Sequence, residues 1–234
     1  MSIGSEIRPV QAAILRVLHY TPEARFSELN TGNISSDHFT FHVKKLLELG
    51  LIEKSGERYR LTPAGKEFTN RFDTDTEKIV LERQAKIGAL VICTREENGQ
   101  AQYLAQQRLK QPFYGFHGFI TGKVKWGEQV LETAARELRE EAGLAAKLTL
   151  VGVEHKMDYS PAGDLLEDKY FFLFRGEEPE GTLTEKFEGG RNFWTSKEEI
   201  LKLPDLFDDV SAMLEAVGQD KFVFHERKYT VAKY

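Results

Sequence analysis

Residues 122–144 read GKVKWGEQVLETAARELREEAGL, and this 23-residue stretch crowds five glutamates into one predicted helix and its approach. Gly122 begins a glycine-containing loop that leads into the helix at Glu128. Gly143 follows the helix in the position of a C-cap glycine and precedes the apolar Leu144. Carboxylates this close on one helix repel one another. The stretch therefore forms either an ordinary solvated helix face or a site built for a positively charged group.

Helical geometry separates these carboxylates from the predicted buried face. At about 100° per residue, the side chains of Glu137, Glu140 and Glu141 share an arc of about 100°. Glu137 and Glu141 lie one turn apart at the border of the apolar stripe, and Arg139 lies on another side of the helix. Clustered oxygen ligands with few cations suit Mg²⁺ or Mn²⁺. The predicted stripe comprises Leu131, Ala134, Ala135, Leu138 and Ala142.

The spacing in this stretch resembles a known family signature. Gly122, five residues, Glu128, seven residues and then RELREEAGL (136–144) match the full box of the Nudix hydrolases. IGALVIC (87–93) is similar to the first strand of that family, and RNFWTSKEEILKL (191–203) to its late strand and following helix. The resemblance spans roughly residues 85–216. One departure is FITGK (119–123), where Ile120 and Thr121 replace the Pro and Gly of many members. The box itself is intact, and the departure bears on the loop shape and hence on substrate choice.

The resemblance implies an α/β/α sandwich with a mixed sheet. It also implies Mg²⁺- or Mn²⁺-dependent cleavage of the pyrophosphate bond in a nucleoside diphosphate linked to another moiety. Carried over by position, the implied metal ligands are Glu137, Glu141, Glu140 and a backbone carbonyl near Thr121 or Gly122. Arg136 would orient Glu137. Glu128 would anchor the loop to the helix, and Gly122 and Gly143 would complete the structure of the box.

Residues outside the box complete the predicted site. The family often takes its general base from a loop before the late strand, where Glu188 and Glu185 are the candidates and ordinary exposed loop glutamates are the alternative. Arg108 and Lys110 are candidate phosphate ligands, although a solvated surface explains them equally well. Several aromatic residues are candidates for stacking on a base, with core packing as the stronger alternative: Tyr114, Phe116, His117, Phe119 and Trp126.

The first third of the chain has a different pattern. It predicts helices over 9–20, 25–33 and 35–50, with Ser27 as the candidate N-cap of the second. Two short strands around Ser55-Gly56 follow, and another helix begins at Pro63. This order, with HFTFHVKKLLELGLIEKSGERYRLTPAGKEF (38–68), resembles the winged helix-turn-helix family over residues 8–72.

In that family the third helix enters the DNA major groove and the wing touches the backbone. The resemblance offers Ser36, Asp37, Thr40, Phe41 and Lys44 on the helix, and Lys54, Arg58 and Arg60 on the wing. Residues 1–76, however, contain 10 Lys and Arg against 10 Asp and Glu, so the basic footprint of DNA binding is weak. The alternative is a winged helix that serves protein contacts or dimerisation.

Composition sets the frame around these motifs. The 234 residues carry a formal net charge of −5, and we expect an α+β protein with a winged helix domain at 1–76 and a Nudix domain at 77–234. The polar segment 73–86 is the candidate linker. A single cysteine, Cys93, excludes an internal disulfide and fits a reducing compartment.

Without a signal segment or membrane span, we expect a soluble cytoplasmic protein with no membrane partner. We also expect a homodimer, with the alternating residues 221–234 as a strand pair at its contact.

Three functions remain open at this level. The leading hypothesis is a metal-dependent Nudix hydrolase that carries a DNA-binding-like domain. The rival is a transcription regulator whose Nudix domain senses a nucleotide. The intact box favours activity over pure sensing. An inactive scaffold that uses the winged helix for protein contacts is the third and weaker option.

Overall fold

The computed structural model describes residues 7–71 and 84–234 of the chain. The chain divides into two compact units, Met1–Arg83 and Gln84–Tyr234. The predicted domain boundary after residue 76 and most of the candidate linker lie outside the described residues.

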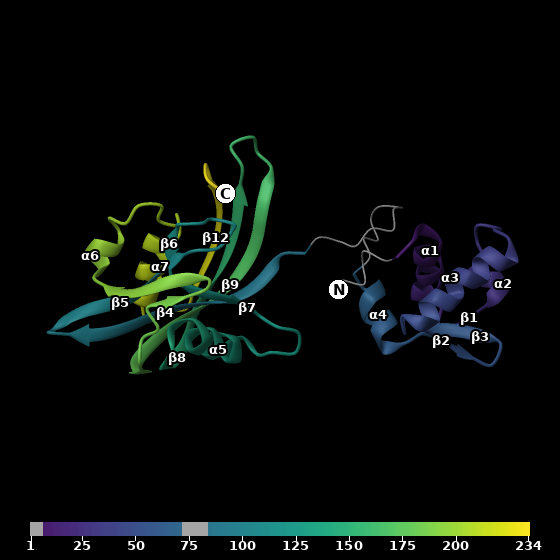
Figure 1. Ribbon diagram of the computed structural model, residues 1–234, viewed down its shortest axis with the longest axis horizontal. Coiled ribbons are helices and arrows are strands. Elements are labelled where there is room, and N and C mark those ends of the chain that lie inside the picture. Colours follow the sequence, from purple (N-terminus) through teal and green to yellow (C-terminus); the bar gives the residue numbers. More distant parts are fainter. Residues whose placement is uncertain (1–6, 72–83) are drawn as a thin grey trace. The chain divides into compact units, whose positions relative to one another are not determined.

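The first unit alternates helices with short strands (Figure 1). Its small sheet has the order β1-β3-β2, with antiparallel neighbours. The predicted helix over 9–20 is confirmed residue for residue, whereas the two-residue strand β1 was missed because it is too short to show a period. The elements are α1 (Pro9–Tyr20), β1 (Ala24–Arg25), α2 (Phe26–Leu29), α3 (Ser36–Glu48), β2 (Ile52–Ser55), β3 (Arg58–Leu61) and α4 (Pro63–Thr69).

The helices of the first unit share one apolar core. Ile14 and Leu15 of α1 and Leu46 of α3 are fully buried in it. One predicted detail is wrong, since Arg25 rather than Ser27 occupies the N-cap of α2 and Ser27 lies within the helix.

The second unit is built around a mixed sheet. The order is β10-β11-β5-β4-β9-β8-β12, with β6 paired to β5 and β7 to β4. The pairs β4–β9 and β8–β12 are parallel and the others antiparallel. The strands are β4 (Lys86–Glu97), β5 (Gln100–Arg108), β6 (His117–Gly118), β7 (Ile120–Lys123), β8 (Leu144–Tyr159), β9 (Leu165–Gly181), β10 (Lys186–Phe187), β11 (Gly190–Thr195) and β12 (Val223–Thr230).

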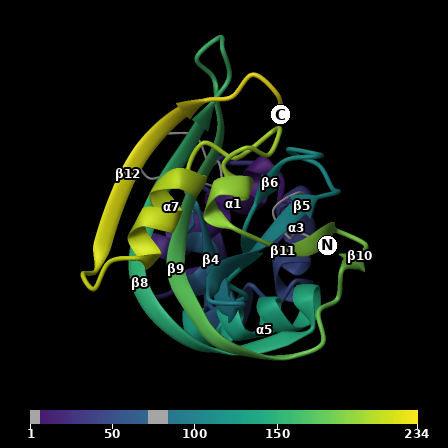
Figure 2. The same ribbon diagram turned by 90° about the vertical axis from the view of Figure 1, so that its left-hand side faces the viewer.

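Two outcomes concern the sequence predictions for this sheet. The segment 87–93, which resembles the first strand of the family, lies within β4, and residues 88–93 are buried on both faces of the sheet. The predicted C-terminal strand pair is wrong, because residues 221–234 contain the single strand β12, which runs parallel to β8 at one edge (Figure 2).

Helices cover both faces of the sheet. From β4, Ala89, Val91 and Cys93 point into the core under α5, whereas Leu90 and Ile92 point into the core shared with α6 and α7. Burial raises the pKa of the Cys93 thiol to about 12, so this residue behaves as a small core hydrophobe. No helix within 7–71 or 84–234 is long and apolar enough to cross a membrane. The helices of this unit are α5 (Val130–Ala142), α6 (Lys197–Ile200) and α7 (Val210–Val217).

Candidate active site

Two glycines fix the path of residues 122–144. A Cβ on Gly122 would lie 1.9 Å from Cδ of Glu137, so only glycine lets the Glu137 side chain cross the backbone of β7. Gly143 ends α5 in the left-handed conformation, with φ of 70°, and a Cβ there would lie 2.6 Å from the Thr182 carbonyl oxygen. Gly122 is therefore required by the close approach of the Glu137 side chain, and Gly143 by the left-handed cap of the helix.

Glu128 ties the loop before α5 to the helix itself. Arg136 donates to both of its oxygens, from Nε at 2.6 Å and Nη2 at 2.9 Å, and Thr133 Oγ1 donates at 2.7 Å. The backbone N–H of Lys125 adds a fourth hydrogen bond at 3.0 Å. Hydrogen bonds from Arg136 and the Lys125 backbone hold the pKa of Glu128 well below its usual range. This arrangement is the one that the anchoring role requires.

Arg136 also reaches the next carboxylates along the helix. Its Nη1 donates to Glu137 Oε1 at 2.6 Å and to Glu140 Oε2 at 3.1 Å. The Glu137 side chain is only 13% exposed, whereas that of Glu140 is 56% exposed. Burial raises the pKa of the Glu137 carboxyl, with Arg136 opposing the rise and Glu141 and Glu140 adding to it. Glu137 thus faces inward and Glu140 faces outward.

Glu141 is buried against the sheet. Its Oε2 accepts a hydrogen bond from Gln106 Nε2 at 2.9 Å, and its Oε1 lies 3.4 Å from Lys110 Nζ. Asn192 completes the contact, since its Oδ1 accepts from Gln106 at 3.1 Å and its Nδ2 donates to the Glu141 carbonyl at 2.7 Å. Gln106 and Asn192 were not predicted from the sequence. Strand alternation did not single out Gln106, because Gln102 and Arg108 lie on the same face of β5.

One predicted feature of α5 is wrong. Leu131 was assigned to the buried stripe, but 48% of it is exposed. Thr133 is fully buried in the helix instead, where Glu128 accepts its hydroxyl. Helical periodicity predicts that a leucine is buried in preference to a threonine. It takes no account of the hydrogen bond to Glu128 that offsets the cost of burying the Thr133 hydroxyl.

Two box carboxylates open onto a cavity of about 680 Å³ in the second unit. Glu137 and Glu141 line it, together with Thr121 and Gly122 of β7. The predicted phosphate ligands Arg108 and Lys110 line the same cavity. Arg108 is fixed there by its Nε, which donates to the Pro112 carbonyl at 2.5 Å, and burial lowers the pKa of its guanidinium.

The donor set fits a magnesium ion. Within residues 7–71 and 84–234, no three His, Cys, Asp or Glu side chains are grouped closely enough to form a complete metal cage. Mg²⁺ does not need one, because it keeps several waters and takes one or two carboxylates plus substrate phosphates. Glu137 and Glu141 would supply the two carboxylates, and β7 lies beside them with its backbone carbonyls. Glu140 is not among the residues that line the cavity.

The predicted residues outside the box are spread more widely. Glu185 and Glu188 are exposed and do not line the cavity, although a Cβ on the neighbouring Gly189 would lie 3.1 Å from Lys110 Nζ. Of the predicted stacking aromatics only Phe119 lines the cavity. Trp126 is 90% exposed and Tyr114 is 52% exposed. Three other rings line the cavity and were not predicted: Phe113, Phe171 and Phe207.

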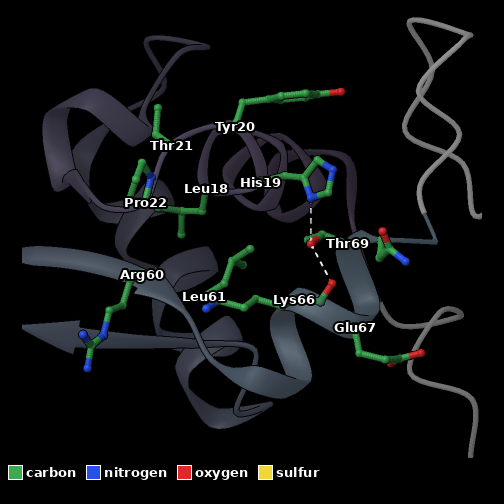
Figure 3. Close-up of a pocket in the computed structure, with 11 residues that line it drawn as sticks. Leu18, His19, Tyr20, Thr21, Pro22, Arg60, Leu61, Lys66, Glu67 and Thr69 are labelled. Carbon is green, nitrogen blue, oxygen red and sulfur yellow. Dashed lines mark hydrogen bonds between the residues drawn. The ribbon is translucent and has the colours of Figure 1, made fainter.

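A second, open pocket of about 850 Å³ lies in the first unit, between the end of α1, β3 and α4 (Figure 3). His19 Nδ1 lies 3.0 Å from Thr69 Oγ1, which in turn donates to the Lys66 carbonyl at 3.2 Å. These polar groups satisfy one another, and Glu67 is the one carboxylate among the residues that line this pocket, whereas four carboxylates line the cavity of the second unit.

The predicted DNA-contacting residues lie mainly on the surface of the first unit. Ser36, Thr40 and Lys44 are exposed on α3, and Lys54 is exposed on β2. On β3, Arg58 lies 3.4 Å from Glu23, and Arg60 lies 2.7 Å from Glu53. Two of the wing cations are therefore already paired with glutamates.

Comparison with known proteins adds the last observation. A model of the NUDIX domain family matches residues 84–216. The MutT mutator protein of Bacillus halodurans is 26% identical, with a TM-score of 0.53 over 62% of this chain and 90% of that one. The NUDIX domain of Shewanella oneidensis NrtR, solved in complex with ADP ribose, is 15% identical, with a TM-score of 0.52 over 68% of this chain and 97% of that one. The second similarity is one of fold, and the family match together with MutT supports a nucleotide-related hydrolase.

Proposed function

Because the chain belongs to the NUDIX domain family, we propose that it is a Mg²⁺- or Mn²⁺-dependent hydrolase that cleaves the pyrophosphate bond of a nucleoside diphosphate derivative. The observation that carries this proposal is the shared cavity of the inward-facing carboxylates Glu137 and Glu141 with the cations Arg108 and Lys110. Carboxylates beside fixed cations in one cavity suit a metal–diphosphate complex, which needs oxygen ligands on one side and positive charge on the other.

Each side chain has a distinct part in this proposal. Bound Mg²⁺ would neutralise phosphate charge and lower the pKa of a water molecule. Arg136 holds Glu137 in place through the hydrogen bond at 2.6 Å. Arg108 and Lys110 bind phosphate oxygens. Glu188 accepts the proton from the attacking water, since its turn lies beside Lys110.

Product release from a panel of nucleotide substrates tests the activity. The panel contains nucleotide sugars, nucleoside triphosphates and dinucleoside polyphosphates, each incubated with the full chain and Mg²⁺. We expect turnover of at least one member and its loss in Glu141→Gln. Absence of turnover on every member, or undiminished turnover in Glu141→Gln, contradicts the proposal.

The proton acceptor has its own comparison. Glu188→Gln should lower kcat by about 100-fold, the usual contribution of general base catalysis. Glu185→Gln, the neighbouring exposed glutamate of the same segment, is the matched control and should remain near wild type. If both variants keep full activity, Glu188 is not the base, and the proton acceptor is to be sought among the residues that line the cavity.

We further propose that the first unit is a winged helix that binds DNA, with α3 as the recognition helix. Its element order and the exposed Ser36, Thr40 and Lys44 support this. A nucleotide-sensing regulator is the alternative function of the whole chain. A DNA mobility shift with and without nucleotide distinguishes the hydrolase from the regulator. DNA binding that weakens with salt and changes when nucleotide is added supports the regulator. No salt-sensitive binding of DNA leaves a protein contact as the role of α3.

We also propose that the chain forms a homodimer through β12. Within the described residues β12 is the terminal strand of the sheet, and Phe222 and Phe224 beside its edge are 62% and 60% exposed. An unpaired strand edge with apolar side chains is a ready surface for a second copy. Light scattering should give a dimeric mass that falls to the monomeric mass in Phe224→Ser.

A further inference from the structure

Two histidines on α3 have no part in the functions proposed above. The segment HFTFH (38–42) places His38 and His42 four positions apart within this helix. Side chains at this spacing are neighbours on a helix, one turn apart. Helical histidine pairs of the same spacing hold a single zinc ion in one class of metalloproteases, so the spacing by itself is compatible with a metal site.

The two imidazole rings already face each other. His42 Nε2 lies 3.2 Å from His38 Nε2, and the ring centres are 4.8 Å apart. Zinc–nitrogen bonds are about 2.0–2.1 Å long, so two imidazole nitrogens on one tetrahedral zinc ion are about 3.3 Å apart. The observed separation therefore matches that of two ligands on a shared ion, and the rings need little movement to bind one.

The surroundings fix one ring and leave the other accessible. His42 is 2% exposed, and its ring centre lies 5.4 Å from that of Phe41. His38, one turn earlier, is exposed. A bound ion would thus have one ligand in a fixed position and an open side toward solvent, where water completes the coordination.

The protonation of the pair does not oppose a metal. Nδ1 of His42 is buried and has no hydrogen-bond partner among the described residues, so no neighbour fixes the proton on one nitrogen of this ring. Burial, then His38 and Arg8, lower the pKa of His42, which keeps the ring in the neutral form that binds metals. A ligating histidine usually donates its other N–H to an acceptor, and the lack of one at Nδ1 predicts a weaker site than a structural zinc site.

The type of ligand distinguishes this pair from the box carboxylates. Imidazole suits Zn²⁺, Ni²⁺ and Cu²⁺, whereas carboxylates suit Mg²⁺. Within residues 7–71 and 84–234, no third histidine, cysteine or carboxylate completes a cluster around the pair. The alternative use of the pair is a hydrogen bond between two neutral rings, in which one Nε2 donates to the other.

We propose that His38 and His42 chelate one divalent transition-metal ion, Zn²⁺, Ni²⁺ or Cu²⁺, on α3 of the first unit. The ion joins two successive turns of the helix, so its binding stabilises the folded helix over the unfolded chain. The proposal is independent of the hydrolase and of the Mg²⁺ that serves it. It gives the first unit a ligand of its own, whether α3 contacts DNA or protein.

Titration of the full chain with Ni²⁺ tests the proposal. Excess Mg²⁺ is present throughout, so that the box carboxylates are occupied. We expect calorimetry to detect a Ni²⁺ site whose affinity falls at least about tenfold in His38→Gln, because a second imidazole on the same helix acts at a high effective concentration. His19→Gln is the matched control, since His19 lies on α1 of the same unit and contacts Thr69 at 3.0 Å rather than a second histidine. Unchanged affinity in His38→Gln, or no Ni²⁺ site in the wild type, overturns the proposal.

The spacing of the pair has its own control. His38→Gln combined with Phe41→His keeps six histidines in the chain but places the two rings at successive positions, which do not face each other on a helix. This double variant should bind Ni²⁺ as weakly as His38→Gln, and thermal unfolding checks that both variants fold. With one equivalent of Cu²⁺, electron paramagnetic resonance should show two coordinated imidazole nitrogens in the wild type and not in either variant. Tight binding by the double variant, or a single coordinated nitrogen in the wild type, means an adventitious ion only and overturns the proposal.

Discussion

Two charged clusters in the second unit follow opposite designs. The box cluster (Glu128, Arg136, Glu137, Glu140 and Glu141) lies on one helix and its approach, has an excess of acid and is open to solvent at Glu140. The wall cluster (Lys156, Asp158, Glu167, Lys169 and Asp209) comes from three separate parts of the chain, is largely buried, and pairs its charges with one another and with Lys86. An excess of carboxylate leaves room for an added cation, whereas buried ions that pair with one another depend on their partners for stability. Substitutions in the box should therefore affect the reaction most, and substitutions in the wall should affect folding.

The largest expected effect is on turnover, in Glu141→Gln. The amide removes a ligand charge while keeping the shape of the side chain, so kcat should fall about 1000-fold, equivalent to about 4 kcal/mol. Thermal unfolding should remain close to that of the wild type. Glu132→Gln, on the exposed side of the same helix, is the control and should keep its activity within about twofold. A large loss in both variants would mean that the helix, rather than its inward charge, was damaged.

The next effect is on stability, in Lys156→Met. Asp209 and Asp158 lie 3.2 and 3.8 Å from Lys156 Nζ and would be left buried without this partner. Breaking a buried pair costs about 3 to 5 kcal/mol, measured as the free energy of unfolding in denaturant. Adding Asp209→Asn should recover part of that loss, since it removes an orphaned charge.

Lys202→Met is the matched control for this stability test. Lys202 pairs with Glu199 at 2.8 Å but on the surface, where ion pairs contribute little. Its unfolding should stay near that of the wild type. A Lys156→Met variant that is as stable as the wild type would show that Lys156 does not stabilise the buried carboxylates of Asp158 and Asp209.

The two clusters also show how far the sequence reaches. The box was predictable because its residues are contiguous and follow the helix period, and α5 begins and ends close to the predicted limits. The wall was not, because Lys156, Lys169 and Asp209 come from different elements and meet only when β8 and β9 pair and α7 packs on the sheet. Gln106 was not predicted for the same reason, because it is separated from its partner Glu141 by 35 residues in the sequence. The short strands β6, β7 and β10 carry too few residues to display a period.

A smaller effect concerns pH and Glu154, which lies beside the wall cluster on β8. Burial raises the pKa of the Glu154 carboxyl to about 8, Asp209 adds to the rise, and Lys156 and Arg227 oppose it. Between about pH 5 and 8 the folded protein holds a proton that the unfolded chain has lost, so the free energy of unfolding falls as pH rises. Glu154→Gln should flatten that decline by about 3 kcal/mol over this range. Parallel pH profiles in denaturant for wild type and variant would contradict the raised pKa.

The smallest effect returns to the box, in Arg136→Lys. Lysine keeps the positive charge but cannot donate to both oxygens of Glu128 while also reaching Glu137, as the guanidinium does at 2.6, 2.9 and 2.6 Å. We expect kcat to fall about tenfold, equivalent to about 1.4 kcal/mol, because Glu137 loses its orientation rather than its charge. Arg139→Lys, an exposed arginine of the same helix, is the control and should be unaffected. Full activity in Arg136→Lys would show that a positive charge is enough to position Glu137. The geometry of the Arg136 guanidinium would then not be needed for the function of the box cluster.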